Sequence, residues 1–423
     1  MSFESGFDLV PLGEVVSFIN GDRSTNYPKG DDYVADGIPF ISAADLADGC
    51  VQKNGVKRIS VSAYNRLRSG KVQYKDVLFC LRGSIGKLAF IQPEEIGAIA
   101  SSLVIVRATE KVDARYLYFI LCSQAGQQAA ASLNNGSAQP NLSVGELQKV
   151  KIPLPSIALQ REIAGTLDSF DNRITLLRET NATLEAIAQA LFQSWFVDFD
   201  PVRAKMEGRA PEGMDEATAA LFPDSFEETE LGAVPRGWSI NSMADVSTVG
   251  IGKTPPRKEQ HWFSENPEDV RWVSIRDMGL YGVYASSTSE FLTNEAVERF
   301  NVRRVPDNTV IMSFKMTIGR VAITDGEMTT NEAIAHFKLA ESAAVSTEYV
   351  YLHLKQFDFT KLSSTSSIAD AVNSKTVREI PVLVPSFDVM SAFQEQIKAI
   401  FAMLKNAEQQ AQTLIVVRDT LLE

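Results

Sequence analysis

The chain has 423 residues, of which 45% are hydrophobic and 22% charged, a composition typical of globular proteins with two or three domains. No apolar run approaches the roughly 18 residues that a membrane-spanning helix needs, and the first residues lack the pattern of a signal peptide. The formal net charge of −12 argues, taken as a whole, against nucleic-acid binding, because duplex DNA is normally met by a basic surface.

The three cysteines, Cys50, Cys80 and Cys122, lie far apart in the first half of the chain. They form neither the spacing of a disulfide framework nor a CxxC metal pair. We therefore expect a reducing, cytoplasmic location and no association with a membrane.

The chain matches itself at a long and nearly constant offset. Five blocks recur in the same order, each between 230 and 234 positions further on. The matching blocks are FISAADL (40–46) with WVSIRDM (272–278), DVLFCLRGSIGKLAFI (76–91) with TVIMSFKMTIGRVAIT (309–324), YLYFIL (116–121) with YVYLHL (349–354), VKIPLPS (150–156) with IPVLVPS (380–386), and QREI (160–163) with QEQI (394–397). A period of this length predicts a duplicated domain rather than a solenoid.

Residues 1–157 form the first globular copy. Short runs of Val, Ile, Phe and Tyr, interrupted by Gly, Pro and Asn, predict a mixed or mostly β fold. Between residues 51 and 87 nine Lys or Arg residues face a single acidic residue, Asp76. This basic run predicts contact with DNA, mostly through phosphates. The candidate DNA-binding residues of this copy are Arg23, Lys53, Lys57, Arg58, Arg82, Ser84 and Lys87.

A long helix is predicted over residues 158–200. Apolar residues recur there at alternating steps of three and four, which is the heptad pattern of a coiled coil. Asn181 occupies one position of this seam, where a polar side chain is typical of a group that sets the register. The aromatic end, Trp195 and Phe196, is either core or an exposed docking site for a partner. The seam residues are Ile163, Leu167, Phe170, Ile174, Leu177, Asn181, Leu184, Leu191, Trp195 and Phe196.

Residues 201–230 are interpreted as an acidic linker. From Asp198 to Glu230 ten acidic residues face only three basic ones. Much of the negative charge of the chain is therefore concentrated outside the two copies, and the objection to DNA binding weakens.

The second globular copy, residues 231–388, is followed by a second long helix, residues 389–423. The candidate DNA-binding residues of this copy are Lys253, Arg257, Lys258, Arg276, Lys315 and Arg320. The seam of its helix is Ile397, Ile400, Leu404, Leu414 and Leu421. The fold class that follows is α+β: two tandem domains, each followed by a long helix, with the two helices pairing as an antiparallel coiled coil.

Catalytic and metal-binding motifs are missing from the sequence. The three histidines, His261, His336 and His353, have no metal-ligand spacing. The segment GIGKT (250–254) lacks the first glycine of a phosphate-binding loop, and two prolines follow it where that motif needs a helix. We find no nucleophile elbow, dinucleotide fingerprint or methyltransferase tetrad. A binding protein is therefore favoured over a stand-alone methyltransferase or nuclease.

Several stretches resemble the specificity subunits of type I restriction-modification systems. They are the glycine turns RGSIGKLAF and KMTIGRVAI, the junction GSAQPNLSVGELQKVKIPLPSIALQREI, the helix end LFQSWFVDFDPVRAKMEG, and the segment LFPDSFEETELGAVPRGW that precedes the second copy. With the duplication, the resemblance covers essentially the whole chain. The second copy departs from it, because it lacks the Gln139-Pro140-Asn141 tripeptide of the first.

This resemblance implies a non-catalytic protein with two target-recognition domains, each reading one half of a bipartite, asymmetric site on double-stranded DNA. It implies that the paired helices set the spacing and dock two modification (methyltransferase) subunits, and that restriction/translocase subunits can join. No cofactor is expected in this chain, since S-adenosylmethionine and ATP with magnesium would belong to those partners. The alternative is a coiled-coil adaptor without a DNA role, which explains the helices but not two basic, diverged domains.

Overall fold

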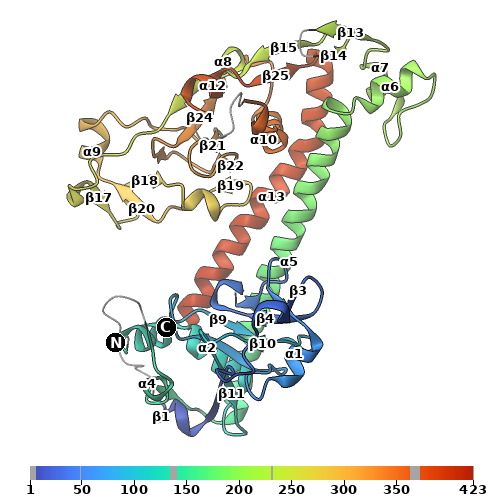
Figure 1. Cartoon of the computed structure of the whole chain (residues 1–423). Helices are drawn as coiled ribbons and strands as arrows, with labels where there is room; N and C mark the ends of the chain where they lie inside the picture. Colours follow the sequence, from blue (N-terminus) through green and yellow to red (C-terminus); the bar gives the residue numbers. More distant parts are fainter. Residues whose placement is uncertain (1–5, 48, 134–140, 230–231, 363–371, 423) are drawn as a thin grey trace. The chain divides into compact units, whose positions relative to one another are not determined.

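The computed structural model describes residues 6–47, 49–133, 141–229, 232–362 and 372–422. The chain divides into two compact units, of which unit 1 comprises residues 1–175 with 412–423 and unit 2 comprises residues 176–411. Each unit holds one globular domain and parts of two long helices (Figure 1). We call the globular parts domain one (residues 6–156, in unit 1) and domain two (residues 232–386, in unit 2).

Domain one is built around two four-stranded sheets. The first sheet is antiparallel throughout and has the order β2-β11-β8-β9, with strands Val16–Asn20, Leu103–Ala108, Val77–Cys80 and Leu88–Phe90. The second has the order β10-β4-β7-β3, with strands Ala98–Ile99, Ile38–Ile41, Arg58–Ile59 and Tyr33–Val34, and its β10–β4 pair is parallel. The continuous apolar runs of β8 and β11 are explained by burial, since all four residues of β8 are buried.

Domain two repeats this plan strand for strand. Its larger sheet has the order β16-β24-β21-β22-β19, with strands Thr248–Ile251, Ile334–Lys338, Val310–Ser313, Val321–Thr324 and Tyr284–Ala285. Its smaller sheet has the order β17-β20-β18-β23, with strands Phe263–Ser264, Glu290–Leu292, Val270–Val273 and Thr329–Thr330. The predicted duplication is therefore confirmed at the level of sheet topology. The counterpart of β19 in domain one is an isolated parallel bridge from Gly49 to Ala89 of β9.

Short two-stranded ribbons complete the strand inventory. The strand β1 (Leu9–Pro11) pairs antiparallel with β12 (Lys151–Pro153), and β15 (Ser239–Ser242) pairs in the same way with β25 (Pro381–Val384). Each of these two ribbons brings the beginning of a domain next to its last strand. Two further ribbons are β5–β6 (Leu46–Ala47 and Cys50–Val51) and β13–β14 (Phe226–Thr229 and Gly232–Pro235).

Several of the short helices begin at a residue whose side chain caps them. Asp113 caps α2 by accepting hydrogen bonds from the backbone N–H groups of Arg115 and Tyr116, and Ser346 caps the equivalent helix α10. The short helices are α1 (Val61–Arg66), α2 (Ala114–Cys122), α3 (Gln124–Ser132), α4 (Val144–Leu147), α6 (Asp200–Met206), α7 (Glu216–Ala220), α8 (Met243–Val246), α9 (Asn294–Arg299), α10 (Thr347–Gln356) and α12 (Ser374–Arg378).

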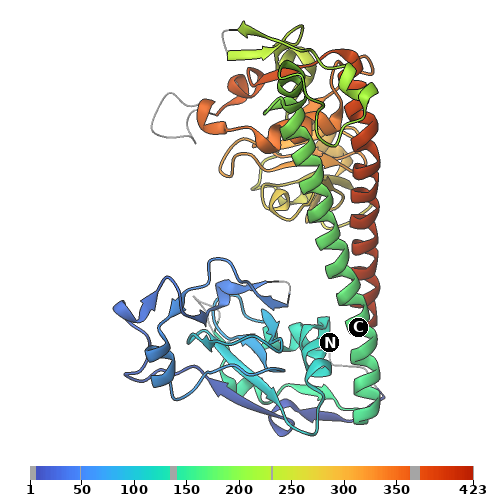
Figure 2. The same cartoon turned by 90° about the vertical axis from the view of Figure 1, so that its right-hand side faces the viewer.

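Two long helices follow the domains, α5 (Ile157–Phe196) and α13 (Phe387–Leu421). They begin one and two residues earlier than predicted, and α5 ends four residues earlier, at Phe196. Within unit 2 they run antiparallel, because Asn181 of α5 contacts Leu404 of α13 whereas Phe196, further along α5, packs against Phe393 (Figures 1 and 2). The predicted antiparallel pairing is confirmed there.

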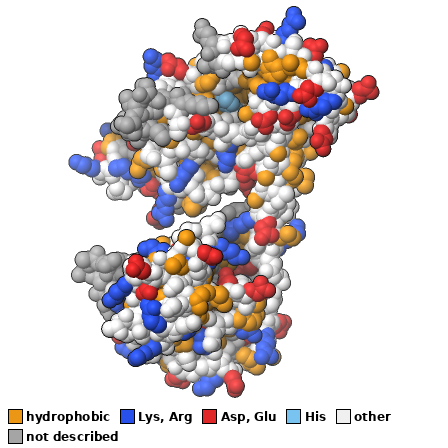
Figure 3. All heavy atoms as spheres, turned by 45° about the vertical axis from the view of Figure 1, so that its right-hand side comes forward, with side chains coloured by type: hydrophobic (Ala, Val, Ile, Leu, Met, Phe, Trp, Pro, Cys, Tyr) orange, Lys and Arg blue, Asp and Glu red, His pale blue; other side chains and the backbone are white. Residues whose placement is uncertain are grey.

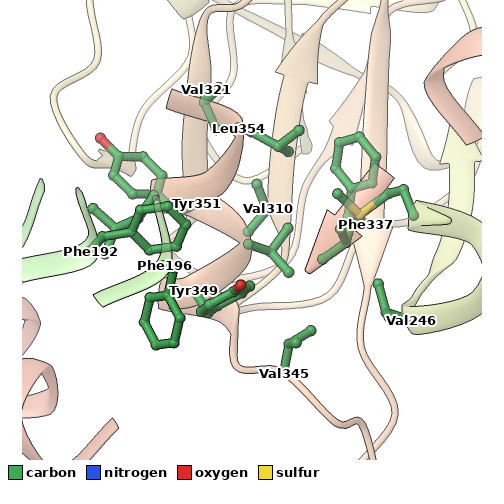
Figure 4. Packing of buried hydrophobic residues seen from close by; sticks show 14 of the residues in the cluster. Phe192, Phe196, Val246, Val310, Val321, Phe337, Val345, Tyr349, Tyr351 and Leu354 are labelled. Carbon is green, nitrogen blue, oxygen red and sulfur yellow. The ribbon is translucent and has the colours of Figure 1, made fainter. Parts of the chain in front are cut away.

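The core of unit 2 joins the helices to domain two. Phe192 and Phe196 of α5 pack against Tyr349 of α10, with ring centroids 5.1 and 5.0 Å apart (Figure 4). Trp195 and Phe196 are 3% and 4% exposed. The alternative of an exposed aromatic docking end is therefore wrong, and both residues are core because domain two and α13 cover them.

The acidic segment 201–230 is folded rather than a plain linker. Its helix α6 buries Val202 and Ala204, and Phe222 packs edge-on against Trp195 with ring centroids 5.0 Å apart. The acidic side chains hide these apolar positions in the sequence. The segment therefore belongs to the core of unit 2, and its interpretation as a linker is corrected.

Candidate nucleic-acid interface

The two glycine turns of the sequence are the tips of equivalent hairpins, β8–β9 in domain one and β21–β22 in domain two. In domain one the backbone N–H of Gly86 donates to the Cys80 carbonyl at 3.2 Å, and in domain two that of Gly319 donates to the Ser313 carbonyl at 2.9 Å. Both glycines adopt left-handed backbone angles, with φ of 87° and 84°. Glycine is needed at this position because the turn requires a positive φ.

The hairpin tip of domain one presents cations to solvent. Arg82, Ser84 and Lys87 are all exposed. The side chain of Gln127 anchors the turn from behind, since its amide donates to the Gly86 carbonyl at 3.0 Å. The tip is thus a fixed loop that carries two exposed cationic side chains, Arg82 and Lys87, an arrangement suited to phosphate contacts.

The rest of the basic run divides into exposed and internally bound cations. Lys53 and Lys57 are exposed, and Lys57 lies 5.8 Å from the ring centroid of Tyr33. Arg58 is half-buried and donates to the Gly37 carbonyl at 2.8 Å. Arg23, from another loop, is exposed and donates to the Ser101 carbonyl at 3.2 Å. Arg58 therefore has a structural bond that the sequence did not reveal.

The single acidic residue of the run is neutralised inside the domain. Asp76 is buried and accepts two hydrogen bonds from Arg107, at 2.7 and 2.8 Å. This paired geometry explains why a charged side chain is tolerated there. The exposed part of the run therefore carries positive charge with little local opposition.

Domain two holds its predicted cations differently. Lys253, Lys258, Arg276 and Lys315 are exposed. Arg257 forms a bidentate ion pair with Glu290, at 2.8 and 2.9 Å, so it braces the smaller sheet. In the view of Figure 3 the Lys and Arg side chains lie among acidic and apolar ones on both domains, rather than in one continuous patch.

Arg320 of domain two supports a loop rather than extending into solvent. It is half-buried, and its guanidinium donates to the Ile275 carbonyl at 3.0 Å. A Cβ on Gly279 would lie 2.6 Å from its Nη1 atom. The loop 275–280 is therefore pressed against the hairpin tip, which the sequence could not indicate because the two segments are far apart in the chain.

The predicted seam residues of α5 line its buried stripe. In unit 1 Leu167 and Ile174 are buried and Ile163 and Phe170 are half-buried, and in unit 2 Leu177 is buried and Leu184 and Leu191 are half-buried. Asn181 donates to the Leu404 carbonyl at 3.4 Å, and its Oδ1 atom is buried without a partner in the described structure. Such a polar group favours one register of the two helices.

The seam of α13 agrees with prediction except at its end. Ile397 and Leu404 are buried, and Ile400 and Leu414 are half-buried. Leu421, however, is 58% exposed, whereas Leu422 packs against the core of domain one. The predicted seam is wrong at Leu421 by one residue, since Leu421, the last residue of α13, faces solvent and the following Leu422 packs against the core.

Charged contacts, rather than aromatic rings, hold the helices in unit 1. Asp171 of α5 accepts hydrogen bonds from Arg115 of α2, at 3.2 Å, and from Arg418 of α13, at 2.8 Å. Arg115 also pairs with Asp168 and lies 4.7 Å from the ring centroid of Tyr118. Arg115 thus seats α5 on domain one, a role for which the sequence gave no signal.

No group of three or more His, Cys, Asp or Glu side chains among the described residues could hold a metal ion, and no helix in the same part of the chain is long and apolar enough to cross a membrane. Burial lowers the pKa of His336 and of His353 to about 4, so both rings are neutral core groups. Gln139 and Pro140, of the tripeptide noted above, lie outside the described residues, whereas the neighbouring Asn141 bridges to Arg82.

Comparison with known proteins identifies the same two regions. The sequence model of the family described as "Type I restriction modification DNA specificity domain" matches residues 4–186 and again residues 235–415. The chain is similar to the type I restriction enzyme HindI specificity subunit of Haemophilus influenzae, with 26% identity over 95% of this chain and 96% of that protein. It is also similar to the MjaIX specificity subunit of Methanocaldococcus jannaschii, with 23% identity over 97% of this chain and 90% of that protein.

A solved structure shares the fold. The crystal structure of the S subunit of a type I restriction-modification system from M. genitalium superimposes with a TM-score of 0.53 and 15% identity, and the match covers 100% of this chain and 97% of that one. The first matched region contains domain one, and the second covers domain two from residue 235 onward. The alternative of an adaptor without DNA specificity domains is not favoured. The chain belongs to the type I restriction modification DNA specificity domain family and carries that domain twice.

Proposed function

We propose that the chain is the non-catalytic, sequence-specific DNA-binding subunit of a type I restriction-modification complex, in which each domain reads one half of a bipartite, asymmetric target. The observation that carries the proposal is the pair of equivalent hairpins. Their backbone hydrogen bonds are the same, yet the exposed residues at their tips differ, Gly83 and Ser84 in domain one against Met316 and Thr317 in domain two. A common frame with different tips suits the reading of two different half-sites.

The cations beside the tips support a role in positioning. Exposed Lys and Arg side chains bind phosphates and fix a protein on the duplex without reading its sequence. They lie next to the tip in both domains, Arg82 and Lys87 in domain one and Lys315 in domain two. The net negative charge does not oppose this role, because many acidic residues are in the segment 201–230.

The partners follow from the proposed role. Two modification subunits, which bind S-adenosylmethionine, would supply methyl transfer, and restriction subunits using ATP and magnesium would join them in the cytoplasm, where the DNA lies. Their docking site is assigned to the paired helices. Leu176 and Ile187 of α5 and Met403 of α13 are between 46% and 54% exposed, although they lie on helices whose other faces are buried.

Methylome sequencing tests the proposal directly. The gene is expressed with its modification subunit genes in a host that lacks them, and methylated positions are compared with a host that receives the modification genes alone. We expect methylation at one two-part motif, only when this chain is present. The purified chain with S-adenosylmethionine should transfer no methyl group. Methylation at the same motif without the chain would contradict the proposal.

The helices are assigned the role of a spacer, which a paired insertion tests. One heptad is inserted after Thr175 of α5 and one after Ala411 of α13, so that the seam stays in phase. Seven residues add about 10 Å, which corresponds to about three base pairs of DNA. We expect unchanged half-sites and a spacer longer by about three base pairs. The control is the same heptad inserted after the exposed Gly213, which should leave the spacer unchanged. A changed half-site with the original spacer would contradict this role.

A further inference from the structure

We infer that Met316, at the hairpin tip of domain two, reads a thymine by apolar contact with its C5-methyl group. This inference rests on the proposed function and assigns one base contact to one residue. Met316 is 85% exposed, the highest fraction among the large apolar side chains of the described residues. A single exposed apolar side chain is common on protein surfaces, so the inference depends on the backbone conformation and the surroundings of Met316.

Met316 also has an unusual backbone conformation. Its φ is 63°, in the left-handed region that side chains with a Cβ rarely adopt. The equivalent residue of domain one is Gly83, with a φ of 80°. Glycine would therefore serve the turn better, since it adopts this conformation without steric cost. A methionine kept in a strained and exposed position indicates a use for its side chain.

The tip is held so that Met316 points away from the domain. Phe314 is 1% exposed and Ile318 is packed against the core, so the residues on both sides of the apex are anchored. The Ser313 hydroxyl donates to the Thr317 carbonyl and closes the loop. The three residues between the anchors, Lys315, Met316 and Thr317, are exposed. The apex is thus a fixed loop that presents one flexible apolar side chain.

The surroundings of Met316 favour DNA as its partner. Lys315 is adjacent and exposed, and the loop 275–280, which Arg320 holds against the hairpin, carries the exposed Arg276 and Leu280. The phosphate backbone would be bound by these cations. In the major groove the only apolar group on a base edge is the thymine methyl. An apolar tip beside an exposed cation therefore fits a thymine better than it fits any other base.

The difference between the domains argues against a protein partner at this tip. A partner subunit that docks on both domains would need the same surface twice. Domain one instead has Gly83 and Ser84 at the equivalent positions, with no apolar side chain. A difference of this kind is expected for a surface that reads bases, because the two half-sites of an asymmetric target differ.

The test combines protein variants with base substitutions in the duplex. The full chain is assembled with its modification subunits, and its affinity is measured on a duplex that carries the motif found by methylome sequencing. Each thymine of the motif is then replaced by deoxyuridine, which lacks only the C5-methyl group. We expect one such replacement to weaken binding by about fourfold, the effect of removing one buried methyl group.

The variants Met316→Gly and Met316→Asn should bind the thymine duplex about fourfold more weakly and should not distinguish it from the deoxyuridine duplex. Both residues tolerate the left-handed backbone, so the thermal midpoint should not fall. Met206→Ala, at another exposed methionine of unit 2, should keep the full response to deoxyuridine.

The outcomes separate the two proposals. If the wild-type complex binds no specific duplex, the proposed function itself fails. If it binds specifically but ignores every deoxyuridine, or if Met316→Gly retains the response, the assignment of Met316 alone is overturned. The same holds if the variant weakens assembly with the modification subunits and leaves the response to deoxyuridine intact, because the tip would then be a protein docking site.

Discussion

Unit 1 and unit 2 hold the same two helices by different chemistry. In unit 2 the helices meet domain two mainly through aromatic rings, such as Phe192 of α5 and Tyr349 of α10, whose ring centroids are 5.1 Å apart. An ion pair between Lys405 of α13 and Asp325, at 2.8 Å, adds to these contacts. In unit 1 an ion-pair network centred on Asp171 joins α5 to Arg115 of the domain and Arg418 of the other helix. Duplication has therefore preserved the backbone plan but only some of the side chains that stabilise it, such as Tyr116 and the equivalent Tyr349. The two units should respond differently to truncation, salt and pH.

The aromatic contacts that hold the helices in unit 2 should be more sensitive to side-chain truncation than the ion pairs of unit 1. Phe393 is fully buried and contacts Phe192, Trp195 and Phe196. Phe393→Ala leaves a cavity and should lower the free energy of unfolding by about 3 to 5 kcal/mol. Tryptophan fluorescence during urea unfolding reports this unit alone, because all four tryptophans of the chain lie within residues 176–411.

The matched control for this change is Phe387→Ala, on the same helix, because Phe387 is 82% exposed. It should change the free energy of unfolding by less than about 0.5 kcal/mol. Equal losses in the two variants would mean that the aromatic cluster does not stabilise unit 2.

Unit 2 should also carry a pH dependence that unit 1 lacks. Burial raises the pKa of Glu408 to about 7, and the charges of Glu185 and Asp325 act in the same direction, whereas hydrogen bonds from the backbone N–H groups of Val283 and Tyr284 lower it. A raised carboxyl pKa means that the folded state binds more protons, so stability falls as pH rises from about 4.5 to about 7.

Glu408→Gln removes this titration and keeps one of the two acceptor oxygens; its NH2 group then faces the other backbone N–H, a cost that does not depend on pH. Between pH 5 and pH 8 the wild type should lose about 2 to 3 kcal/mol relative to the variant, allowing for the partial exposure of Glu408. The effects of His336 and His353 are common to both proteins and cancel in this difference. Parallel pH profiles for the two proteins would show that Glu408 is ionised throughout.

The ion pairs that join α5 to domain one in unit 1 should be sensitive to salt. Arg115→Leu leaves Asp168 and Asp171 without their partner in α2, and we expect a loss of about 2 kcal/mol in the protection of α2 amides against hydrogen exchange. The wild type should lose part of that protection in high salt, and the variant should not. Arg66→Leu, which breaks the exposed pair with Asp32, should cost at most about 1 kcal/mol. If hydrogen-exchange protection in the wild type is independent of salt, these ion pairs do not stabilise the contact between α2 and α5.

The cations of domain one should contribute to DNA affinity through counterion release. Replacing Lys57, Arg82 and Lys87 by Gln should weaken binding by about tenfold and reduce the slope of log affinity against log salt by about 2 to 3. The control is Lys149→Gln, because Lys149 is already paired with Glu146 at 2.8 Å. An unchanged slope in the triple variant would place the DNA-binding face elsewhere on the domain.

Much of the fold is visible in the sequence because repetition and periodicity are local signals. The five repeated blocks predicted the two domains, and the heptads predicted both long helices to within four residues at each end. The packing of segment 201–230 was not visible, since the few apolar residues that it buries, such as Val202 and Phe222, are scattered among acidic ones. Its contribution depends on the distant Trp195 and Trp238.

The candidate site was predictable in its charges and not in its geometry. The exposed Arg82, Lys87 and Lys315 could be found by composition and by the glycine turns. The internal bonds of Arg58, Arg257 and Arg320 could not, because each depends on a partner 21 or more positions away. The backbone strain at Met316 is likewise invisible in one copy, although alignment of the two copies places it opposite Gly83.

The paired ribbons at the base of each domain have an evolutionary consequence. Leu9 faces Pro153 across β1 and β12, and Ser239 faces Val384 across β15 and β25, so the chain enters and leaves each domain at neighbouring points. A segment with adjacent ends can be exchanged by recombination without rethreading the protein. Each domain is in this sense a cassette, and a lineage could acquire a new half of its methylation pattern in a single genetic exchange while its helices remained unchanged.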